Sequence, residues 1–586
     1  MRKTKIVCTI GPACDSEEML SKMIRAGMNV ARLNFSHGTH EEHKDKIQKI
    51  KKLRKELDTP VAIMLDTKGP EIRTGKLENG SVELIEGKEI ILTSEEIIGN
   101  EKRVSVTYKN LPRNLSKGST LMIDDGLIEL KVREVSGTEI LCDIIIGETL
   151  KNSKSVNIPG VTIDMPYMND ADKSDILFGI QNDVDFIALS FVRTPQDIKD
   201  VRRFINANGC YNIELIAKIE NTEGVKNIID IITVSDGIMV ARGDMGVEIP
   251  FEELPHLQKT IITDCFSAGK KVITATQMLE SMIVHSRPTR AEITDVANAI
   301  YDGTSAIMLS GETAVGAFPL KSLETMSKIA EKTESCIDYK SYGEQVGSLK
   351  KLETNITNAI SNATCRAAHD LGAAAIVAVT LSGNSARRIS RFRPDTPIIA
   401  VTPHEKTYMQ LALSWGIIPL LNSYIENTQE LFNDVAEKIV QRGLVKDGDI
   451  VVMTGSTQRS SGATNTLQVH LVGDILLKGK SVGRENVSGR VCVIKDEEKD
   501  MSSFIAGDIL AVSRTSTDIL HIMRQCSGII TEENEQDSGV VAAAYALDIP
   551  VVSNARSATS ILKTGAKIKI DITKGYVYNS DASEED

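Results

Sequence analysis

Charged side chains stand directly after short apolar runs at several places in this sequence. Lys218 and Glu220 end one such run, and Asp244 closely follows another. Two carboxylates on neighbouring strands suit a hard divalent cation such as Mg²⁺, which keeps few protein ligands and takes its other oxygens from a substrate. A lysine beside that cation can neutralise a developing oxyanion or a transferring phosphoryl group. The three residues therefore predict metal-assisted phosphoryl transfer or enolate stabilisation on a small anionic substrate.

A second group of polar residues ends two earlier runs, at Arg32, Asn34, Ser36, Asp66 and Thr67. Residues i and i+2 of a strand share a face, so Arg32, Asn34 and Ser36 are expected to point together. The planar guanidinium of Arg32 fits a phosphate or a carboxylate. The other four residues offer oxygens but only one carboxylate, which would suit a monovalent cation; a capped turn is the alternative. For the whole set of strand-end groups, the alternative is solvated loop caps and structural ion pairs.

Eight short β-branched runs must position these groups. They are apolar on both faces, as expected for strands of a parallel sheet covered by helices, and most gaps between them can hold a crossover helix. The pattern predicts a (β/α)8 barrel, which collects functional groups at the carboxyl ends of its strands. An open doubly wound sheet is the alternative. The runs are residues 5–10, 29–34, 61–66, 185–191, 213–219, 237–241, 271–275 and 305–310.

The gap between the third and fourth runs is much longer than the others. Residues 70–165 contain short alternating pieces separated by Gly or Asn-Gly signals, which predicts an antiparallel all-β cap domain inserted over the mouth of the barrel. The barrel itself is then expected over residues 1–69 and 166–337. A polar, Lys-rich stretch at 338–354 marks the next boundary. An α/β allosteric domain is predicted for residues 338–473 and an extra β/α domain for 474–586, which ends in an acidic tail.

The composition is that of an average soluble globular protein, with 41% apolar and 25% charged residues in a chain of 586. A disordered scaffold, a collagen-like fibre and a disulfide-stapled miniprotein are excluded. The net charge of −12 and the 4% aromatic content argue against a nucleic-acid partner. The nine cysteines are scattered without a CxxC pair, and no apolar stretch approaches the ~18 residues that span a membrane. We expect a reduced, cytoplasmic protein with no membrane partner.

Several blocks of this sequence resemble the pyruvate kinases. They occur in the family's order and at its spacing, and together with the placement of the cap and the α/β domain they extend the resemblance over about residues 1–473. The blocks are residues 6–12 (IVCTIGP), 31–38 (ARLNFSHG), 65–74 (LDTKGPEIRT), 213–225 (IELIAKIENTEGV), 239–250 (MVARGDMGVEIP), 274–282 (TATQMLESM), 288–299 (PTRAEITDVANA) and 307–314 (IMLSGETA).

The resemblance implies that phosphoenolpyruvate and ADP are converted to pyruvate and ATP. By matching motif, Arg32 would bind the phosphoryl group, and Lys218 would stabilise that group and the enolate. Glu220 and Asp244 would hold Mg²⁺ (or Mn²⁺). Gly243, Asp244 and Thr276 would contact the substrate, and Thr276 could relay the proton that converts the enolate to pyruvate.

The same resemblance implies a potassium site and a nucleotide site. Asn34, Ser36, Asp66 and Thr67 match the K⁺ ligands, and Glu71 goes with K⁺ dependence in this family. Lys154 matches a cap-domain lysine that reaches ATP, although its SKS context departs from the family's usual KKG. The nucleotide-contacting residues implied are Asn34, Phe35, Ser36, His37, Arg73 and Lys154.

The stretch Thr380-Leu-Ser-Gly-Asn-Ser-Ala386 follows a strand and opens a helix that carries Arg387 and Arg388. Backbone N–H groups at a helix start, with hydroxyls and arginines nearby, suit a phosphate; a plain β-turn-α junction is the alternative. In the family the matching loop lines an allosteric sugar-phosphate pocket. The resemblance therefore implies a homotetramer and a phosphorylated allosteric effector, with the effector contacts at Thr380, Ser382, Asn384 and Ser385.

The last ~112 residues resemble the swivelling phosphohistidine domain of phosphoenolpyruvate-utilising enzymes, which some bacillus-type pyruvate kinases carry. Residues 529–533 and 543–552 show the match. Where the phosphorylated histidine would stand, residues 537–541 place Gly539. Glycine cannot carry phosphate, so we predict a structural or assembly role. His521 is the domain's only imidazole, and it is expected to be a packing or surface residue.

Two other functions remain open at this stage. A barrel lyase or aldolase could use the same metal–enolate chemistry. The inserted β cap and a nucleotide requirement discriminate, because a lyase needs no ADP. A non-catalytic metabolite sensor could bind its ligand at the 380–386 loop. The presence of Arg32, Lys218, Glu220 and Asp244 weighs against the sensor.

Overall fold

The computed structural model describes residues 2–339, 355–425, 427–455, 464–473, 475–495, 500–514, 517–534 and 539–579. Most of the predicted boundary stretch (340–354), Asp537 and Ser538 of the swivelling-domain match and the acidic tail lie outside the described residues. The chain forms two units: residues 1–363, 378–423 and 461–464 make the first, and residues 364–377, 424–460 and 465–586 make the second.

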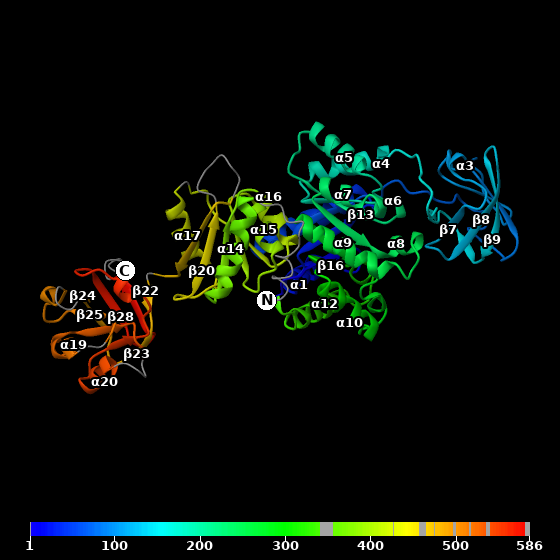
Figure 1. Ribbon diagram of the computed structural model, residues 1–586. Coiled ribbons are helices and arrows are strands. Elements are labelled where there is room, and N and C mark those ends of the chain that lie inside the picture. Colours follow the sequence, from blue (N-terminus) through cyan, green and yellow to red (C-terminus); the bar gives the residue numbers. More distant parts are fainter. Residues whose placement is uncertain are drawn as a thin grey trace. The chain divides into compact units, whose positions relative to one another are not determined.

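Eight parallel strands close into a barrel in the order β1-β16-β15-β14-β13-β12-β3-β2, which confirms the predicted (β/α)8 fold (Figure 1). In-register pairing such as Val7 with Val30 and Ile238 with Val272 aligns the strand ends. The carboxyl ends therefore meet around one mouth. The strands are β1 (Lys5–Thr9), β2 (Val30–Asn34), β3 (Ala62–Asp66), β12 (Phe186–Leu189), β13 (Glu214–Ile219), β14 (Gly237–Ala241), β15 (Lys271–Ala275) and β16 (Ala306–Leu309).

Both faces of these strands are buried, which is why the runs in the sequence are continuous rather than alternating. Val7, Met64 and Phe186 belong to a core inside the barrel. Their neighbours Ile6 and Leu65 point outward into the core that the helices cover. Each large apolar side chain removed from water contributes about 1.5–3 kcal/mol, so the two cores hold the strand ends at fixed positions.

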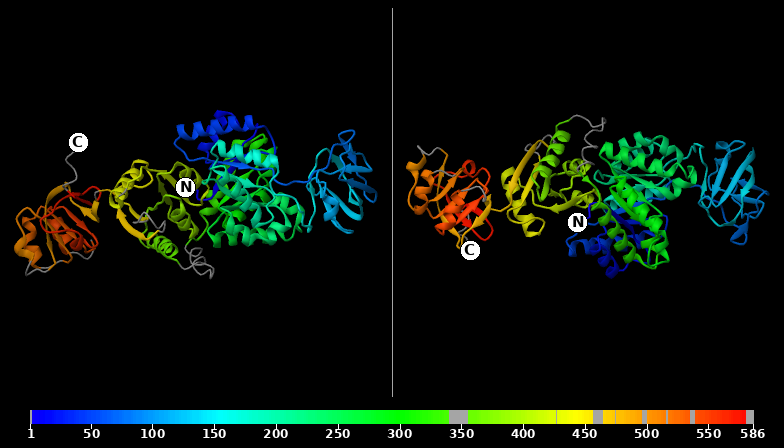
Figure 2. Two further views of the ribbon diagram at one scale, coloured as in Figure 1. Left: turned by 90° about the horizontal axis from the view of Figure 1, so that it is seen from above. Right: turned by 60° about the horizontal axis from the view of Figure 1, so that its bottom comes forward.

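Helices flank the strands on the outside of the barrel, as Figure 2 shows from two further directions. Several begin at a capping side chain: the Thr39 hydroxyl and the Glu42 carboxylate form a capping box, as do Thr289 and Glu292. These caps fix where each βα loop ends. The helices are α1 (Glu17–Arg25), α2 (His40–Glu56), α4 (Asp170–Gln181), α5 (Pro195–Ala207), α6 (Thr222–Lys226), α7 (Ile228–Val234), α8 (Arg242–Glu248), α9 (Leu254–Ala268), α10 (Arg290–Tyr301), α11 (Gly311–Ala314) and α12 (Pro319–Glu334), with the 3-10 turn η1 (Glu280–Ile283).

A β domain with its own core is inserted between β3 and β12. The predicted purely antiparallel arrangement is wrong for one pair, because β5 and β6 run parallel, with Leu92 opposite Val104. A six-stranded sheet has the order β11-β7-β8-β9-β5-β6, and β10 pairs with β4. The elements are β4 (Ser81–Glu83), β5 (Glu89–Thr93), β6 (Arg103–Ser105), α3 (Leu111–Asn114), β7 (Thr120–Ile123), β8 (Ile128–Ser136), β9 (Glu139–Ile146), β10 (Thr149–Lys151) and β11 (Val156–Asn157).

An α/β region follows the barrel, with strands and helices alternating along the chain. In the first unit β18 pairs parallel with β19, and in the second β20 pairs antiparallel with β21. The elements are α14 (Ile356–Asp370), β17 (Ala375–Val379), α15 (Asn384–Arg391), β18 (Ile398–Thr402), α16 (Glu405–Gln410), η2 (Leu411–Leu413), β19 (Ile417–Leu421), α17 (Thr428–Gln441), β20 (Ile450–Gly455) and β21 (Thr466–Leu471).

The carboxyl-terminal residues form an eight-stranded sheet in the order β22-β29-β28-β24-β25-β26-β27-β23. Two apolar clusters bury it: Val491 and Ile530 belong to one, Cys492 and Ile529 to the other, so neighbouring residues alternate between them. The elements are β22 (Ile475–Lys478), β23 (Lys480–Val482), β24 (Val487–Ile494), η3 (Met501–Ser503), β25 (Ile509–Val512), α19 (Thr517–Ile522), η4 (Met523–Gln525), β26 (Gly528–Thr531), α20 (Gly539–Ala546), β27 (Val551–Ser553), α21 (Ala558–Ile561), β28 (Lys567–Asp571) and β29 (Tyr576–Asn579).

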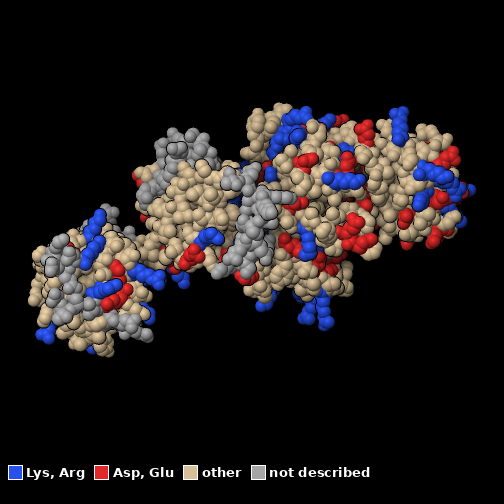
Figure 3. Space-filling view, viewed as in Figure 1, with Lys and Arg blue, Asp and Glu red and all other residues tan. Residues whose placement is uncertain are grey.

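Among the described residues, no helix is both long enough and apolar enough to cross a membrane. Figure 3 shows acidic and basic side chains interspersed over the visible face of the barrel and the β domain. That face therefore shows no large patch of a single charge.

Candidate active site

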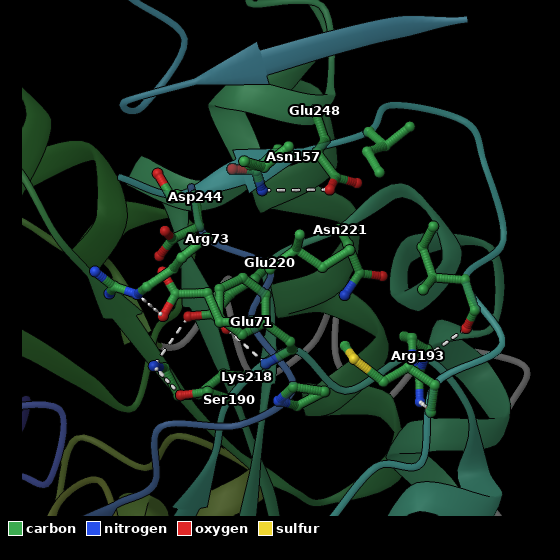
Figure 4. Close-up of a pocket in the computed structure, with 18 of the residues that line it drawn as sticks. Glu71, Arg73, Asn157, Ser190, Arg193, Lys218, Glu220, Asn221, Asp244 and Glu248 are labelled. Atoms are coloured by element: carbon green, nitrogen blue, oxygen red, sulfur yellow. Dashed lines mark hydrogen bonds and ion pairs between the residues drawn. The ribbon is translucent and has the colours of Figure 1, made fainter. Parts of the chain in front are cut away.

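A cavity of about 420 Å³ lies at the carboxyl ends of the barrel strands and is lined by both barrel and β-domain residues. Lys218 and Glu220 reach it from the end of β13, and Asp244 from the first turn of α8, directly after β14. Lys154 and Asn157 reach it from the β domain. Figure 4 shows Lys218, Glu220 and Asp244 pointing into one space. The structure thus brings together groups that are far apart in the sequence.

Lys218 is buried, and its ammonium group contacts oxygens from three different strand ends. The Nζ atom lies 2.7 Å from Ser190 Oγ, 2.9 Å from Glu220 Oε1 and 3.1 Å from Asp66 Oδ1. Burial alone would lower the pKa of Lys218, but the charges of Asp66 and Glu220 outweigh it, so the pKa lies above its ordinary value. The side chain is therefore a fixed positive charge rather than a proton donor or base at neutral pH.

Arg32 is held against Asp66 at the floor of the cavity. Its Nε lies 2.6 Å from Asp66 Oδ2, and its Nη1 donates to Thr9 Oγ1 at 2.9 Å. Burial raises the pKa of Asp66, but Arg32 and Lys218 together bring it below its usual value. Asp66 therefore stays ionised and orients two cations toward the same space.

Glu220 and Asp244 have the donor set that a divalent cation requires. Burial raises the pKa of each carboxyl group, and the charge of Asp244 raises that of Glu220 further. Glu220 is buried and Asp244 half-buried, and two carboxylates that repel each other in this way are stabilised by a cation between them. Among the described residues no cluster of three or more Asp, Glu, His or Cys could hold a metal. The pair fits Mg²⁺, which commonly takes one or two carboxylates and completes its shell with water and phosphate oxygens.

The predicted K⁺ ligands lie around the end of β2 and β3. Strand β2 ends at Asn34, so the expectation that alternation places Ser36 on the strand face of Arg32 is wrong: Ser36 lies in the following turn, where its N–H donates to Asn34 Oδ1 at 3.1 Å. Asn34 and Ser36 line the cavity. Asp66 and Thr67 are buried beside it, and Thr67 Oγ1 donates to the Ala188 carbonyl at 3.3 Å.

The predicted nucleotide contacts divide into two groups. Arg73, Lys154 and His37 line the cavity, where Arg73 Nε lies 2.8 Å from Glu71 Oε2 and Lys154 Nζ lies 2.7 Å from Asp124 Oδ1. These two cations are therefore held by carboxylates that an anionic ligand would have to displace. Phe35 is buried instead, with its ring stacked on His43 at 4.0 Å.

Thr276 has a φ of +66°, in the left-handed region that a β-branched residue rarely adopts. Its hydroxyl accepts a hydrogen bond from the Gly243 N–H at 2.9 Å and donates to the Ala275 carbonyl at 2.6 Å. The Arg242 guanidinium donates to the Thr276 carbonyl at 2.8 Å. These contacts join the ends of β14 and β15 and maintain a strained conformation of the kind that clusters at functional sites.

Among the cavity residues that sequence reasoning missed are Ser190, Asn157 and Glu248. Ser190 Oγ accepts from Lys218 and donates to Asp66 Oδ1 at 3.2 Å, and Asn157 donates to Glu248 Oε1 at 3.4 Å. Ser190 could have been found, because it directly follows the fourth strand as the other groups follow theirs. Asn157 and Glu248 carry no such signal, since their contact joins the β domain to α8.

The predicted effector loop is closed by its own side chains. Thr380 Oγ1 accepts from the Gly383 N–H at 2.9 Å, and Ser385 is buried and accepts a hydrogen bond from Thr464. Ser382 and Asn384 are exposed, and both accept hydrogen bonds from Arg387. The loop therefore has an ordered turn with two open polar residues.

Comparisons with known proteins show the family of this chain. Residues 1–323 match the barrel domain of pyruvate kinase, and residues 358–470 match its alpha/beta domain. The chain belongs to the pyruvate kinase family. It is therefore a phosphotransferase. Residues 504–575 match the mobile domain of PEP-utilising enzymes, which confirms the resemblance seen in the appended residues.

Relatives match from end to end. The pyruvate kinase of Geobacillus stearothermophilus is 45% identical over 99% of both chains, and that of Staphylococcus saprophyticus is 46% identical over 100% of both. A solved structure of a pyruvate kinase from Cryptosporidium parvum is 40% identical, with a TM-score of 0.77, and covers 80% of this chain and 96% of its own.

Proposed function

We propose that the enzyme transfers the phosphoryl group of phosphoenolpyruvate to ADP, producing pyruvate and ATP. The observation that carries this proposal is the fixed Lys218 ammonium, which lies 2.9 Å from the buried Glu220 carboxylate and close in the same cavity to Asp244. That arrangement places positive charge where both a transferring phosphoryl group and an enolate oxygen need it.

In the proposed reaction, Arg32 and Lys218 bind the phosphoryl oxygens. The bond between phosphorus and the enol oxygen breaks as a β-phosphate oxygen of ADP bonds to phosphorus. The enolate left behind takes a proton at its methylene carbon to become pyruvate, while Lys218 remains charged beside the enolate oxygen. The Thr276 hydroxyl, held by Gly243, is the proposed proton relay, and Gly243 and Asp244 complete the substrate contacts.

Metals complete the proposed site. Glu220 and Asp244 would hold Mg²⁺ or Mn²⁺, which neutralises phosphoryl charge when bound. Asn34, Ser36, Asp66 and Thr67 would hold K⁺. Arg73 and Lys154, with the Asn34–His37 turn, would contact the nucleotide phosphates after their carboxylate partners release them.

The test compares Lys218→Gln with Lys22→Gln, which removes an equally charged but exposed lysine on α1. Pyruvate formation is followed by coupled NADH oxidation with phosphoenolpyruvate, ADP, Mg²⁺ and K⁺. We expect Lys218→Gln to lower kcat by at least about 100-fold and Lys22→Gln to leave it unchanged, with both variants folded by circular dichroism.

Wild-type protein that releases no pyruvate, or Lys218→Gln turnover close to wild type, would contradict the proposal. Product formed without ADP would favour the lyase or aldolase instead.

We further propose a homotetramer with a phosphorylated effector at the 380–385 loop, working in the cytoplasm, where ADP and phosphoenolpyruvate occur together. Support for assembly comes from large apolar side chains exposed on the barrel, among them Phe251 at 84% and Val284 and Val315 at 66%. Light scattering should give roughly four times the chain mass of 63.9 kDa.

A further inference from the structure

The β domain returns to the barrel through a return segment, residues 158–169, which connects β11 to α4 without helix or strand of its own. The side chains of Ile163 and Met165 pack against the core of the β domain. Two residues further on, Tyr167 is buried in the core that the barrel helices cover. The return segment therefore passes from one core to the other within a few residues, and whatever holds it there helps to place the β domain.

Arg193 attaches the return segment to the barrel. Its guanidinium group donates from Nη1 to the Ile163 carbonyl and from Nη2 to the Met165 carbonyl, both at 2.7 Å. Between these two, the Asp164 carbonyl accepts a hydrogen bond from the Tyr108 hydroxyl of the β domain at 2.6 Å. Three successive carbonyls are thus held by the barrel, the β domain and the barrel. Figure 4 shows Arg193 among the residues that line the cavity.

The backbone that carries Arg193 is itself held firmly. Arg193 lies in the loop between β12 and α5, where its N–H donates to Asp197 Oδ2 and its carbonyl accepts from Asn227 Nδ2, both at 2.9 Å. The neighbouring chain approaches this loop closely, because a Cβ atom on Gly224 would lie 2.5 Å from the Val192 carbonyl oxygen. A side chain on such a fixed loop is pre-organised to hold a partner segment.

The same loop contacts the proposed reaction centre. Ser190 Oγ accepts the hydrogen bond from Lys218 Nζ at 2.7 Å, and the Ser190 carbonyl accepts one from the Tyr167 hydroxyl at 2.8 Å. The Phe191 N–H donates to Glu220 Oε2 at 2.6 Å. None of these three hydrogen bonds uses the guanidinium group further along the loop. A substitution of that side chain should therefore leave the contacts to the reaction centre in place.

We propose that Arg193 is a positioning residue that holds the β domain in place over the barrel mouth. The inference rests on the proposed function, in which Lys154 of the β domain binds the nucleotide while Arg32 and Lys218 of the barrel bind the phosphoryl group. A planar guanidinium has two donor arms in a fixed fork, so it can span two carbonyls of one segment, whereas a lysine has the charge without the fork. Loss of the fork would displace the nucleotide contacts and spare the phosphoenolpyruvate contacts.

The kinetic test compares Arg193→Gln and Arg193→Lys with wild type. Arg203→Gln, on the exposed surface of α5, is the matched control. We expect both Arg193 variants to raise the half-saturating ADP concentration by at least about 5-fold and the control to leave it unchanged. The half-saturating phosphoenolpyruvate concentration should stay within about 2-fold of wild type in every variant. A general loss of stability would not separate the two substrates in this way.

Hydrogen–deuterium exchange of the return segment tests the contact without turnover. Its amides should exchange at least about 10-fold faster in both Arg193 variants than in wild type, while slow exchange in α5 shows that each variant is folded. Unchanged exchange in Arg193→Gln would overturn the proposal. So would wild-type kinetics in Arg193→Lys, or an equal rise of both half-saturating concentrations. If wild type releases no pyruvate, the proposed function fails, and the exchange rates alone decide whether Arg193 holds the return segment.

Discussion

Lys218 and Arg32 share one carboxylate, since both form ion pairs with Asp66. Ser190 contributes a third, uncharged oxygen to the same arrangement. Removing one partner of a buried ion pair costs about 3–5 kcal/mol, because the remaining charge is left without compensation. A substitution of Lys218, Arg32 or Asp66 is therefore expected to change both catalysis and stability. Ser190 is uncharged, so its substitution tests the positioning of Lys218 by itself.

Ser190→Ala should lower kcat by about 10-fold, because it removes a hydrogen bond to a charged group without removing a charge. The half-saturating ADP concentration should stay within about 2-fold, since Ser190 is not among the proposed nucleotide contacts. Steady-state kinetics and thermal melting measure the two effects. Ser116→Ala, on an exposed β-domain turn, is the control. A kcat equal to wild type would show that Ser190 does not position Lys218.

The Glu220 and Asp244 carboxyls should make Mg²⁺ binding depend on pH. Their raised pKa values mean that protons compete with the metal at a higher pH than for ordinary carboxylates. The half-saturating Mg²⁺ concentration should therefore rise as the pH falls from 8 to 6, and Asp244→Asn should increase it by at least about 10-fold. Titration calorimetry with Mg²⁺ measures both. Asp45→Asn, an exposed carboxylate on α2, should match wild type throughout; a flat pH profile for wild type would contradict the argument.

At the scale of an element, β1 shows that the amino ends of the barrel strands also carry buried charge. Lys5 Nζ donates to the Ile417 carbonyl at 2.7 Å, and burial lowers the pKa of Lys5 to about 7. The charges of Arg2, which lowers this pKa, and Glu334, which raises it, are smaller influences. The buried Lys5 side chain is tolerated at this end of the barrel because it can lose its proton and become neutral.

This lowered pKa predicts a stability that rises with pH. In the unfolded chain Lys5 keeps its proton up to a pKa near 10.5, whereas in the folded chain it loses it above about 7. The unfolded state thus binds more protons between these values, so raising the pH from 7 to 9 should increase the free energy of unfolding by up to a few kcal/mol. Urea midpoints at the two pH values should differ more in wild type than in Lys5→Met. An equal change in the urea midpoint between the two pH values in wild type and in Lys5→Met would contradict the lowered pKa of Lys5.

For the whole molecule, residues 504–575 match the mobile domain of PEP-utilising enzymes, but the predicted histidine position holds Gly539, the first residue of α20. His521 is exposed on α19. Incubation of the full chain with ³²P-labelled phosphoenolpyruvate should give no acid-labile phosphohistidine, and His521→Asn should behave identically. Label that appears in wild type and disappears in His521→Asn would overturn the structural role predicted for the domain.

Much of the barrel could be predicted because each strand is buried on both faces, which leaves a continuous apolar run in the sequence. Strands with weaker patterns were missed. In β19, Pro419 interrupts an apolar run and argues against a strand, although Pro is tolerated at sheet edges. Strand β23 is only three residues long and begins with a lysine. The domain limits and the roles of the site residues stay predictions.

The site was harder to predict where it depends on contacts between separate elements. Strand-end position identified Lys218, Glu220 and Arg32, because periodicity and burial mark a strand's end. It could not show that Asp124 holds Lys154, since this pair depends on how the β domain folds, or that Glu71 pairs with Arg73 two residues further along the chain. The parallel pairing of β5 and β6 is likewise a tertiary outcome that no short window encodes.

Strand β13 carries Glu214 at one end and Lys218 with Glu220 near the other. At about 3.3 Å per residue, roughly 13 Å separates Glu214 from Lys218 along the strand. An inhibitor bound at the amino ends of the barrel strands, beside Glu214, would thus leave the proposed phosphoenolpyruvate site open. Its potency would not decline when substrate accumulates behind the inhibited step. Inhibitors that compete with substrate at an active site lose potency under that condition.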